Sequence, residues 1–393
     1  MNRTDRIRDM LEPLENFERL HAATVRRFGA SVVDLSYPNP RVPLDDRPYR
    51  TLAEVAGRVG VEDLRYSPFG GFTTARRRVA TALALRHGLP YNYRDVILTP
   101  GATAAINLVL GELFTPPARV LVIAPCWMDY PLYLATHRLD YAFVLTDDDK
   151  HLDLAAIERA WNPHTRGLII SQPASPTGVC YSGEEVTALA GLLDRMTTTR
   201  TGPPLVLNDE THCDQIWSGR PVRSLAEDYP HTVTVHSFGK AWQMQGQRIG
   251  YAAVHPHLAH RHAARELLVA GMRTTGYYAP AALTQHLLTA LVPFTPRLDP
   301  LAALQRRARD RLRRSGHRVI DADATRFVYV QVPDGDDLDY VRLAADRGVL
   351  VMPSGIFHEP GHFRLALNTD GPTLDRALDV LADLPVRRAE HHA

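Results

Sequence analysis

Short apolar runs that alternate with helical stretches constrain the fold of this 393-residue chain more than any other feature. Stretches such as 152–161 and 183–196 have helical periodicity and lie between runs that are too short to be helices. This alternation predicts a mostly parallel sheet with helices on both faces and with ligands at the carboxyl ends of the strands. The expected strands are residues 95–99, 119–125, 141–145, 167–170, 205–207, 232–235 and 249–254.

A lysine follows one of these strands in a chain that otherwise uses arginine. Lys150 and Lys240 are the only lysines among the 45 basic residues. An arginine keeps its proton in a protein, whereas a lysine in an apolar site or near other cations can lose it and attack a carbonyl group. Ser237 precedes Lys240 and Arg248 follows it, so that a hydroxyl and a guanidinium could hold a phosphate nearby. Lys150 is the weaker candidate, because three consecutive aspartates precede it and would keep its ammonium protonated.

A second motif joins the strand 95–99 to a helical stretch. Gly101 allows a tight turn, and Ala102 and Thr103 would then present free backbone N–H groups at a helix N-terminus. Such a terminus binds anions readily, although strand-to-helix turns in general favour glycine and threonine. The turn therefore becomes informative only in combination with the Lys240 segment.

The order of Ser237, Lys240 and Arg248, ending in Arg-Ile-Gly-Tyr, resembles the pyridoxal-phosphate lysine motif of class I/II aminotransferases and their fold type I relatives. The resemblance covers about residues 30–385. It implies an α/β fold of type I, in which a large domain with a mostly parallel seven-stranded sheet is joined to a smaller α+β domain. We expect an N-terminal arm and part of the small domain in 1–45, the large cofactor-binding domain in 46–285 and the C-terminal small domain in 286–393. Relatives are homodimers, and we expect the same here.

The resemblance also assigns roles around the cofactor, pyridoxal 5′-phosphate. Lys240 would form the Schiff base and later act as general base, and Asp209 would pair with the pyridine nitrogen. Trp127 would stack on the ring, and Tyr66 would reach the phosphate bound by the partner subunit. The expected cofactor-binding residues are Tyr66, Gly101, Ala102, Thr103, Trp127, Ser175, Asp209, His212, Ser237, Lys240 and Arg248.

The segment Pro353-Ser354-Gly355-Ile356-Phe357 resembles the stretch that precedes the substrate-binding arginine of the family. Arg364 would therefore grip the α-carboxylate of an amino acid through a two-pronged salt bridge. Tyr37 is the second residue that we expect at the substrate.

Two positions differ from the family pattern. In relatives an asparagine and a tyrosine hold the 3′ oxygen of the cofactor, and here Ser175 and His212 take their places. An imidazole can still donate a hydrogen bond and can change charge near neutral pH, so we expect an altered proton affinity of the Schiff base. With Pro38, where relatives often have a glycine, these changes leave two reactions open. One is amino transfer to a 2-oxo acid, and the other is a lyase or carbon–carbon bond-forming reaction on an amino acid with a leaving group, such as S-adenosylmethionine.

Composition argues against several other classes of protein. A formal net charge of +1 with interspersed acids and bases gives no indication of a nucleic-acid or membrane surface. The arginine-rich stretch 299–314 is typical of a solvated helix face. A transcription regulator of the same fold would need a further DNA-binding domain, and only about 30 residues precede the similar region.

Cysteines, histidines and apolar segments complete the picture. Three cysteines without CxxC spacing fit reduced thiols, and we find neither a signal peptide nor an apolar run of about 18 residues, so we expect a cytoplasmic protein. The histidines at 255, 257, 260 and 262 have no thiol or carboxylate at matched spacing, so we expect no metal site there.

Overall fold

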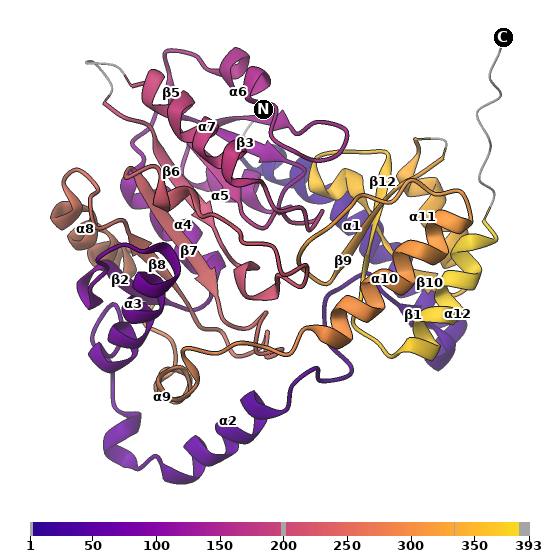
Figure 1. The fold of residues 1–393 in the computed structure, drawn as a ribbon, viewed down its shortest axis with the longest axis horizontal. Coiled ribbons are helices and arrows are strands. Elements are labelled where there is room, and N and C mark those ends of the chain that lie inside the picture. Colours follow the sequence, from indigo (N-terminus) through magenta and orange to yellow (C-terminus); the bar gives the residue numbers. More distant parts are fainter. Residues whose placement is uncertain (1–2, 198–201, 334, 385–393) are drawn as a thin grey trace.

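The structure, a computed structural model, describes residues 3–197, 202–333 and 335–384 (Figure 1). Its main element is a seven-stranded sheet of order β2-β8-β7-β6-β5-β3-β4. Strand β8 is antiparallel to both neighbours, and the other strand pairs are parallel. The mostly parallel sheet predicted from the sequence is therefore confirmed. Its strands are β2 (Val96–Thr99), β3 (Arg119–Ala124), β4 (Asp140–Leu145), β5 (Thr165–Ser171), β6 (Leu205–Asp209), β7 (Thr232–Ser237) and β8 (Gly250–Val254).

Helices cover both faces of this sheet because side chains alternate along each strand. Val120 and Val122 of β3 pack with α4, α5 and α8 on one face, whereas Leu121 and Ile123 pack with α6 and α7 on the other. Helices α3 and α9 pack at the end of the sheet formed by β2 and β8. The helices of this unit are α2 (Arg47–Arg58), α3 (Thr73–His87), α4 (Ala102–Leu113), α5 (Tyr130–Thr136), α6 (Leu154–Ala160), α7 (Gly183–Arg195), α8 (Arg261–Thr274) and α9 (Ala282–Leu291).

Helix α9 contains the domain boundary that we expected between residues 285 and 286. Its Leu287 and Leu288 are fully buried and belong to the same cluster as Trp242 and the buried side of α3. A division after α9 therefore fits the packing better than a division at residue 285.

The second unit uses both ends of the described chain and lies to the right in Figure 1. Strand β1 (Val33–Asp34) pairs in parallel with β10 (Val349–Leu350), and a three-stranded antiparallel sheet has the order β11-β12-β9. The remaining elements are α1 (Arg3–Phe28), β9 (Phe327–Gln331), α10 (Asp299–Arg314), α11 (Asp337–Ala345), β11 (Met352–Pro353), β12 (His362–Ala366) and α12 (Gly371–Ala382). The expected smaller α+β unit is thus present.

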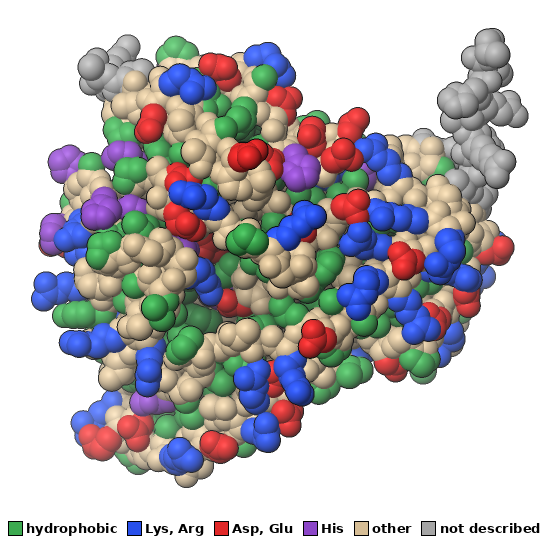
Figure 2. Space-filling model, in the orientation of Figure 1, with side chains coloured by type: hydrophobic (Ala, Val, Ile, Leu, Met, Phe, Trp, Pro, Cys, Tyr) green, Lys and Arg blue, Asp and Glu red, His purple; other side chains and the backbone are tan. Residues whose placement is uncertain are grey.

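Ion pairs neutralise much of the arginine-rich face of α10. Arg307 and Arg311 pair with Asp375 and Asp379 of α12, and Arg309 and Arg313 share Asp321. Acidic and basic side chains are accordingly interspersed over this part of the surface in Figure 2. Within the described residues, every helix is too short or too polar to cross a membrane.

Candidate functional site

A cavity of about 280 Å³ lies at the carboxyl ends of the parallel strands and is closed by residues of the second unit. Helix α1 contributes Leu14 and Glu18, and the start of β9 contributes Phe327. Eleven of the residues singled out from the sequence line it, namely Tyr37, Ala102, Thr103, Trp127, Ser175, Asp209, His212, Ser237, Lys240, Arg248 and Arg364. The structure thus brings together side chains that are up to 327 positions apart, from residue 37 to residue 364.

Lys240 occupies the turn that follows β7, and its amine faces this cavity. Burial lowers the pKa of Lys240 from 10.5 to about 8, and the positive charges of Arg364, Arg326 and Arg248 lower it further, whereas Asp209 opposes them. An appreciable fraction of the amine is therefore uncharged just above neutral pH. Only this uncharged form can act as a nucleophile.

Lys150 is held in a different way from the one that we expected. Its ammonium is buried and donates a hydrogen bond to Oε1 of Glu359 at 2.9 Å, rather than pairing with the preceding aspartates. Asp147 instead accepts hydrogen bonds from the backbone N–H groups of Asp149 and His151. This fixed ion pair lies outside the cavity and leaves Lys240 as the lysine that faces it.

The turn at Gly101 lies against Arg248. Gly101 has a φ of +84°, and a Cβ at this position would lie 2.5 Å from Nη2 of Arg248. The turn therefore needs glycine both for its backbone conformation and for the close approach of the guanidinium. Arg248 has no carboxylate partner among the described residues and donates only to the carbonyl of Gln245, at 2.9 Å. The N-terminus of α4, Arg248 and the Ser237 hydroxyl form a cradle suited to a phosphate.

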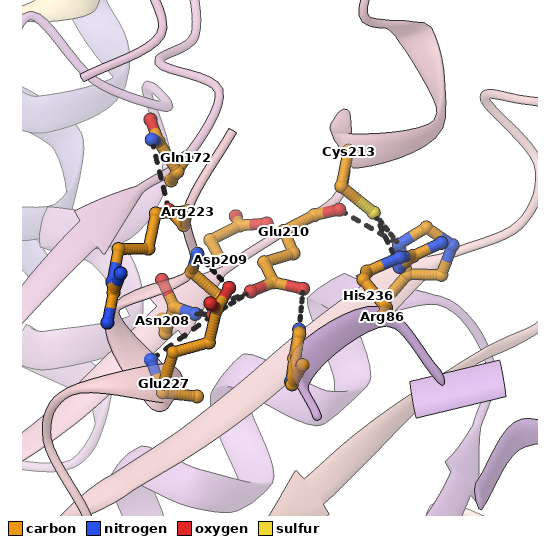
Figure 3. Close-up of polar contacts among 12 residues, drawn as sticks. Arg86, Gln172, Asn208, Asp209, Glu210, Cys213, Arg223, Glu227 and His236 are labelled. Carbon is orange, nitrogen blue, oxygen red and sulfur yellow. Dashed lines mark hydrogen bonds and ion pairs between the residues drawn. The ribbon is translucent and has the colours of Figure 1, made fainter. Parts of the chain in front are cut away.

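Asp209 ends β6 with its carboxylate at the cavity. Its Oδ2 accepts a hydrogen bond from the Tyr130 hydroxyl at 2.7 Å, and its Oδ1 accepts one from the Thr211 N–H at 2.9 Å. The next residue, Glu210, is tied to Asn208 and to His87 in the network drawn in Figure 3. This buried network fixes the end of β6 and so fixes the direction of the Asp209 carboxylate.

Arg364 is a buried cation without a carboxylate partner among the described residues. Its Nη2 donates to the carbonyl of Ser36 at 2.9 Å, and its Nε has no hydrogen-bond partner. The guanidinium carbon lies 4.2 Å from the ring centroid of Phe327 and 4.5 Å from that of Phe357. Two rings therefore hold the guanidinium in place while part of its donor edge stays free for an anion.

His212 differs from our expectation in its charge. Burial lowers its pKa to about 3, and the nearby charges of Lys240, Arg326 and Arg364 lower it further. The imidazole is therefore neutral throughout the physiological range, and the expected change of charge near neutral pH is wrong. Its Nδ1 lies 3.0 Å from Oε1 of Gln215, and Gln215 donates from Nε2 to the carbonyl of Lys240 at 3.2 Å.

Tyr66 is the expected site residue that lies away from the cavity. Its exposed fraction is 90%, and its ring packs beside Tyr278 at a centroid distance of 5.8 Å. The described chain cannot place this side chain in its own cavity, so the role implied by the resemblance requires a second subunit.

Metal-ligating side chains gather at one place outside the cavity. Cys213, Asp214 and His236 lie close enough to bind one ion, but Arg86 donates hydrogen bonds to both Cys213 (2.9 Å) and Asp214 (2.5 Å). A cation already occupies the position that an ion would need. Of the histidines in 255–262, which gather near α8 at the left of Figure 2, His255 is buried and its Nε2 bonds to the carbonyl of Ala226.

Several residues of the cavity were not recognised in the sequence. Tyr130, Phe327 and Glu18 belong to no short motif, and their positions follow from the fold alone. Arg326 offered a signal, since it is the one charged residue in the apolar stretch 324–330. The cavity fits an aldehyde that also carries a phosphate and a basic ring nitrogen, because Lys240, the cradle at Gly101 and Asp209 provide one matching group for each.

Comparison with known proteins agrees with this geometry. The family described as aminotransferase class I and II matches residues 45–381. A probable aspartate/prephenate aminotransferase of Rhizobium leguminosarum is 26% identical, over 59% of this chain and 58% of that protein. The aspartate/prephenate aminotransferase of Thermus thermophilus is 24% identical over 92% and 93% of the two chains. Among solved structures, an amino transferase from Eubacterium rectale superimposes with a TM-score of 0.88 at 22% identity, over 93% of this chain and 94% of that one.

Proposed function

Because this chain belongs to the class I and II aminotransferase family, we propose specific roles for its residues in amino transfer. The chain is a pyridoxal-phosphate-dependent aminotransferase with the type I fold. The alternative that the sequence left open, a lyase or bond-forming enzyme, is not supported, because the named relatives are aminotransferases.

Three side chains carry out the reaction in this proposal. Pyridoxal phosphate, when bound, supplies an electron-withdrawing ring that stabilises negative charge at the substrate α-carbon. Lys240 binds the aldehyde carbon, gives it up to the incoming amino acid and then moves the proton at the α-carbon, a task suited to an amine with a pKa of about 8. Asp209, oriented by Tyr130, faces the ring nitrogen, and Arg364 holds the α-carboxylate.

The remaining residues bind and shield the cofactor. Arg248, Ser237 and the N-terminus of α4 at Gly101 hold its phosphate, and Trp127 covers one face of its ring and excludes water. The observation that carries the proposal is that an amine of lowered pKa, a carboxylate and an unpaired guanidinium line one cavity in this arrangement.

A single-turnover experiment tests the proposed reaction. Purified holoenzyme is mixed with a panel of amino acids, including S-adenosylmethionine, and the cofactor is extracted and identified by chromatography. Accumulation of pyridoxamine phosphate together with the matching 2-oxo acid supports amino transfer. Regeneration of the aldehyde form with loss of a substrate side group would contradict it.

The charge of the cavity indicates the kind of amino acid that it accepts. Glu18 and Asp129 line it, and neither forms an ion pair within the described residues. A second carboxylate on the substrate would meet like charges here, whereas an uncharged or basic side chain would not. We therefore propose an amino donor with an uncharged or basic side chain, although the named relatives act on aspartate. Glu18→Gln should improve kcat/KM for aspartate relative to leucine, and an unchanged ratio would count against this assignment.

A homodimer in the cytoplasm is the proposed working form. The exposed Tyr66 would then reach the phosphate in the partner's cavity, which the position of Tyr66 on the described chain leaves as the available arrangement. Mixing two inactive variants, Tyr66→Phe and Lys240→Ala, tests this idea. Hybrid dimers keep one intact site and should recover activity, whereas mixtures that stay inactive would refute a shared site.

A further inference from the structure

Arg326 is a buried cation for which the reaction just described has no use. It lies immediately before β9, and its side chain is 1% exposed. Its Nε and Nη2 have no hydrogen-bond partner, and it pairs with no carboxylate among the described residues. Burying a guanidinium without a partner is costly, because the charge loses its hydration and gains nothing in return. A bound anionic atom would compensate this charge.

The backbone next to Arg326 is attached to the segment that carries His212. The N–H of Thr325 donates to the carbonyl of Gln215 at 3.0 Å. The side chain of Gln215 in turn joins the His212 ring to the carbonyl of Lys240. Arg326 therefore lies where these two residues meet, and its charge contributes to the lowered pKa of both.

The state of the His212 ring shows which groups are available to an anion. Gln215 donates from Nε2 to the carbonyl of Lys240, so its Oε1 faces the imidazole and accepts from Nδ1–H. The neutral ring therefore carries its hydrogen on Nδ1, and its Nε2 is left with a lone pair. A nitrogen with a lone pair cannot donate to an oxyanion. His212 is thus unsuited to the role of the tyrosine that it replaces.

We propose that Arg326, rather than His212, provides the positive charge for the 3′ oxygen of bound pyridoxal phosphate. In the cofactor this oxygen is attached beside the aldehyde carbon that Lys240 binds, on the side opposite the phosphate. Arg248 and Gly101 hold the phosphate, so the 3′ oxygen belongs to the side of the cavity formed by Ser175 and His212. The inference rests on the proposed function, since it requires that Lys240 bind the cofactor.

The consequence concerns the proton on the nitrogen that joins Lys240 to the cofactor. A cation beside the 3′ oxygen favours the ionised oxygen and repels a proton on the neighbouring nitrogen. The proton is therefore lost at a lower pH than it would be without Arg326. A charge at ~7 Å in an effective dielectric of ~20 to 40 changes such a pKa by about 1–2 units.

The first test is a titration of the visible absorption of holoenzymes. Arg326→Met should move the midpoint upward by about 1 pH unit or more, Arg326→Lys should restore most of the wild-type value, and His212→Phe should change it less than Arg326→Met does. A midpoint in Arg326→Met equal to that of the wild type would overturn the proposal. So would an unchanged midpoint combined with a raised KM for dicarboxylic amino acids alone, because Arg326 would then bind substrate.

The second test keeps the proposal falsifiable if the variants do not fold. The wild-type apoenzyme is titrated with pyridoxal phosphate and with its 3-deoxy analogue, which lacks the oxygen in question. The wild type should prefer the natural cofactor about tenfold or more, and Arg326→Met should lose most of this preference. Equal affinities in the wild type would overturn the proposal. A complete absence of lysine-bound cofactor in every protein would instead refute the proposed function.

Discussion

The lowered pKa of Lys240 allows a direct measurement of the charges around it. Its value falls from 10.5 to about 8, with burial as the largest cause and Arg364 as the largest of the positive charges. A unit charge at ~7 Å in an effective dielectric of ~20 to 40 accounts for about 1–2 pKa units. Replacing Arg364 with methionine, which fills similar space without a charge, should therefore raise the pKa of Lys240 in the apoenzyme by about one unit or more.

The small number of lysines makes this measurement selective. Reductive methylation with carbon-13 formaldehyde labels Lys150, Lys240 and the α-amino group, and each labelled amine gives its own NMR signal. The chemical shift of the Lys240 signal is followed from pH 6 to 11 in the wild-type apoenzyme and in Arg364→Met. The Lys150 signal serves as an internal reference, because its ammonium is buried against Glu359 outside the cavity.

A matched control separates local charge from general disturbance. Arg223 pairs with Asp228 on the surface and does not line the cavity, so Arg223→Met should leave the Lys240 midpoint unchanged. The reasoning is refuted if Arg364→Met and the control give the same midpoint, or if Arg364→Met lowers it. In either case, the cavity would not concentrate positive charge on the amine.

Three further results are expected. Lys240→Ala should abolish the visible absorption of the reconstituted enzyme, because Lys150 lies outside the cavity, and an unchanged band would remove the central assignment. Gly101→Ala should weaken cofactor binding about tenfold in equilibrium dialysis, since a Cβ would crowd Arg248 and strain a φ of +84°; wild-type affinity would argue against the phosphate cradle. The rate of cofactor attachment to the apoenzyme should rise with pH up to about 8 and then level off, because only the neutral amine attacks. A flat profile between pH 6 and 9 would contradict this.

Local sequence signals predicted the elements of the fold well. The helices expected at 73–87 and 299–314 have these bounds in the structure, and all seven strands of the sheet lie at the expected runs. These signals work because hydrophobic periodicity and turn chemistry act within a few residues. The carboxyl ends of parallel strands share one edge of a sheet, and this rule explains why Asp209 and Lys240 meet in one cavity.

Contacts between distant residues were harder to predict. Lys150 pairs with Glu359, 209 positions away, and no local pattern near either residue indicates this. The charge of His212 depends on burial and on three cations from different segments, so its isolated chemistry gave the wrong expectation. Arg326 stood out in an apolar strand, but its meaning became apparent only when its side chain proved to be buried without a partner.

The antiparallel strand β8 sets a length constraint on the catalytic segment. Pairing of Ser237 with Gly250 closes a hairpin, and residues 238–249 between them carry both Lys240 and Arg248. This hairpin therefore acts as a ruler that matches the distance between the aldehyde and the phosphate of the cofactor. Insertion or deletion of a single residue within 238–249 would change that distance while leaving every catalytic side chain present. Enzyme engineering that varies loop length should therefore spare this segment, even though part of it is exposed to solvent.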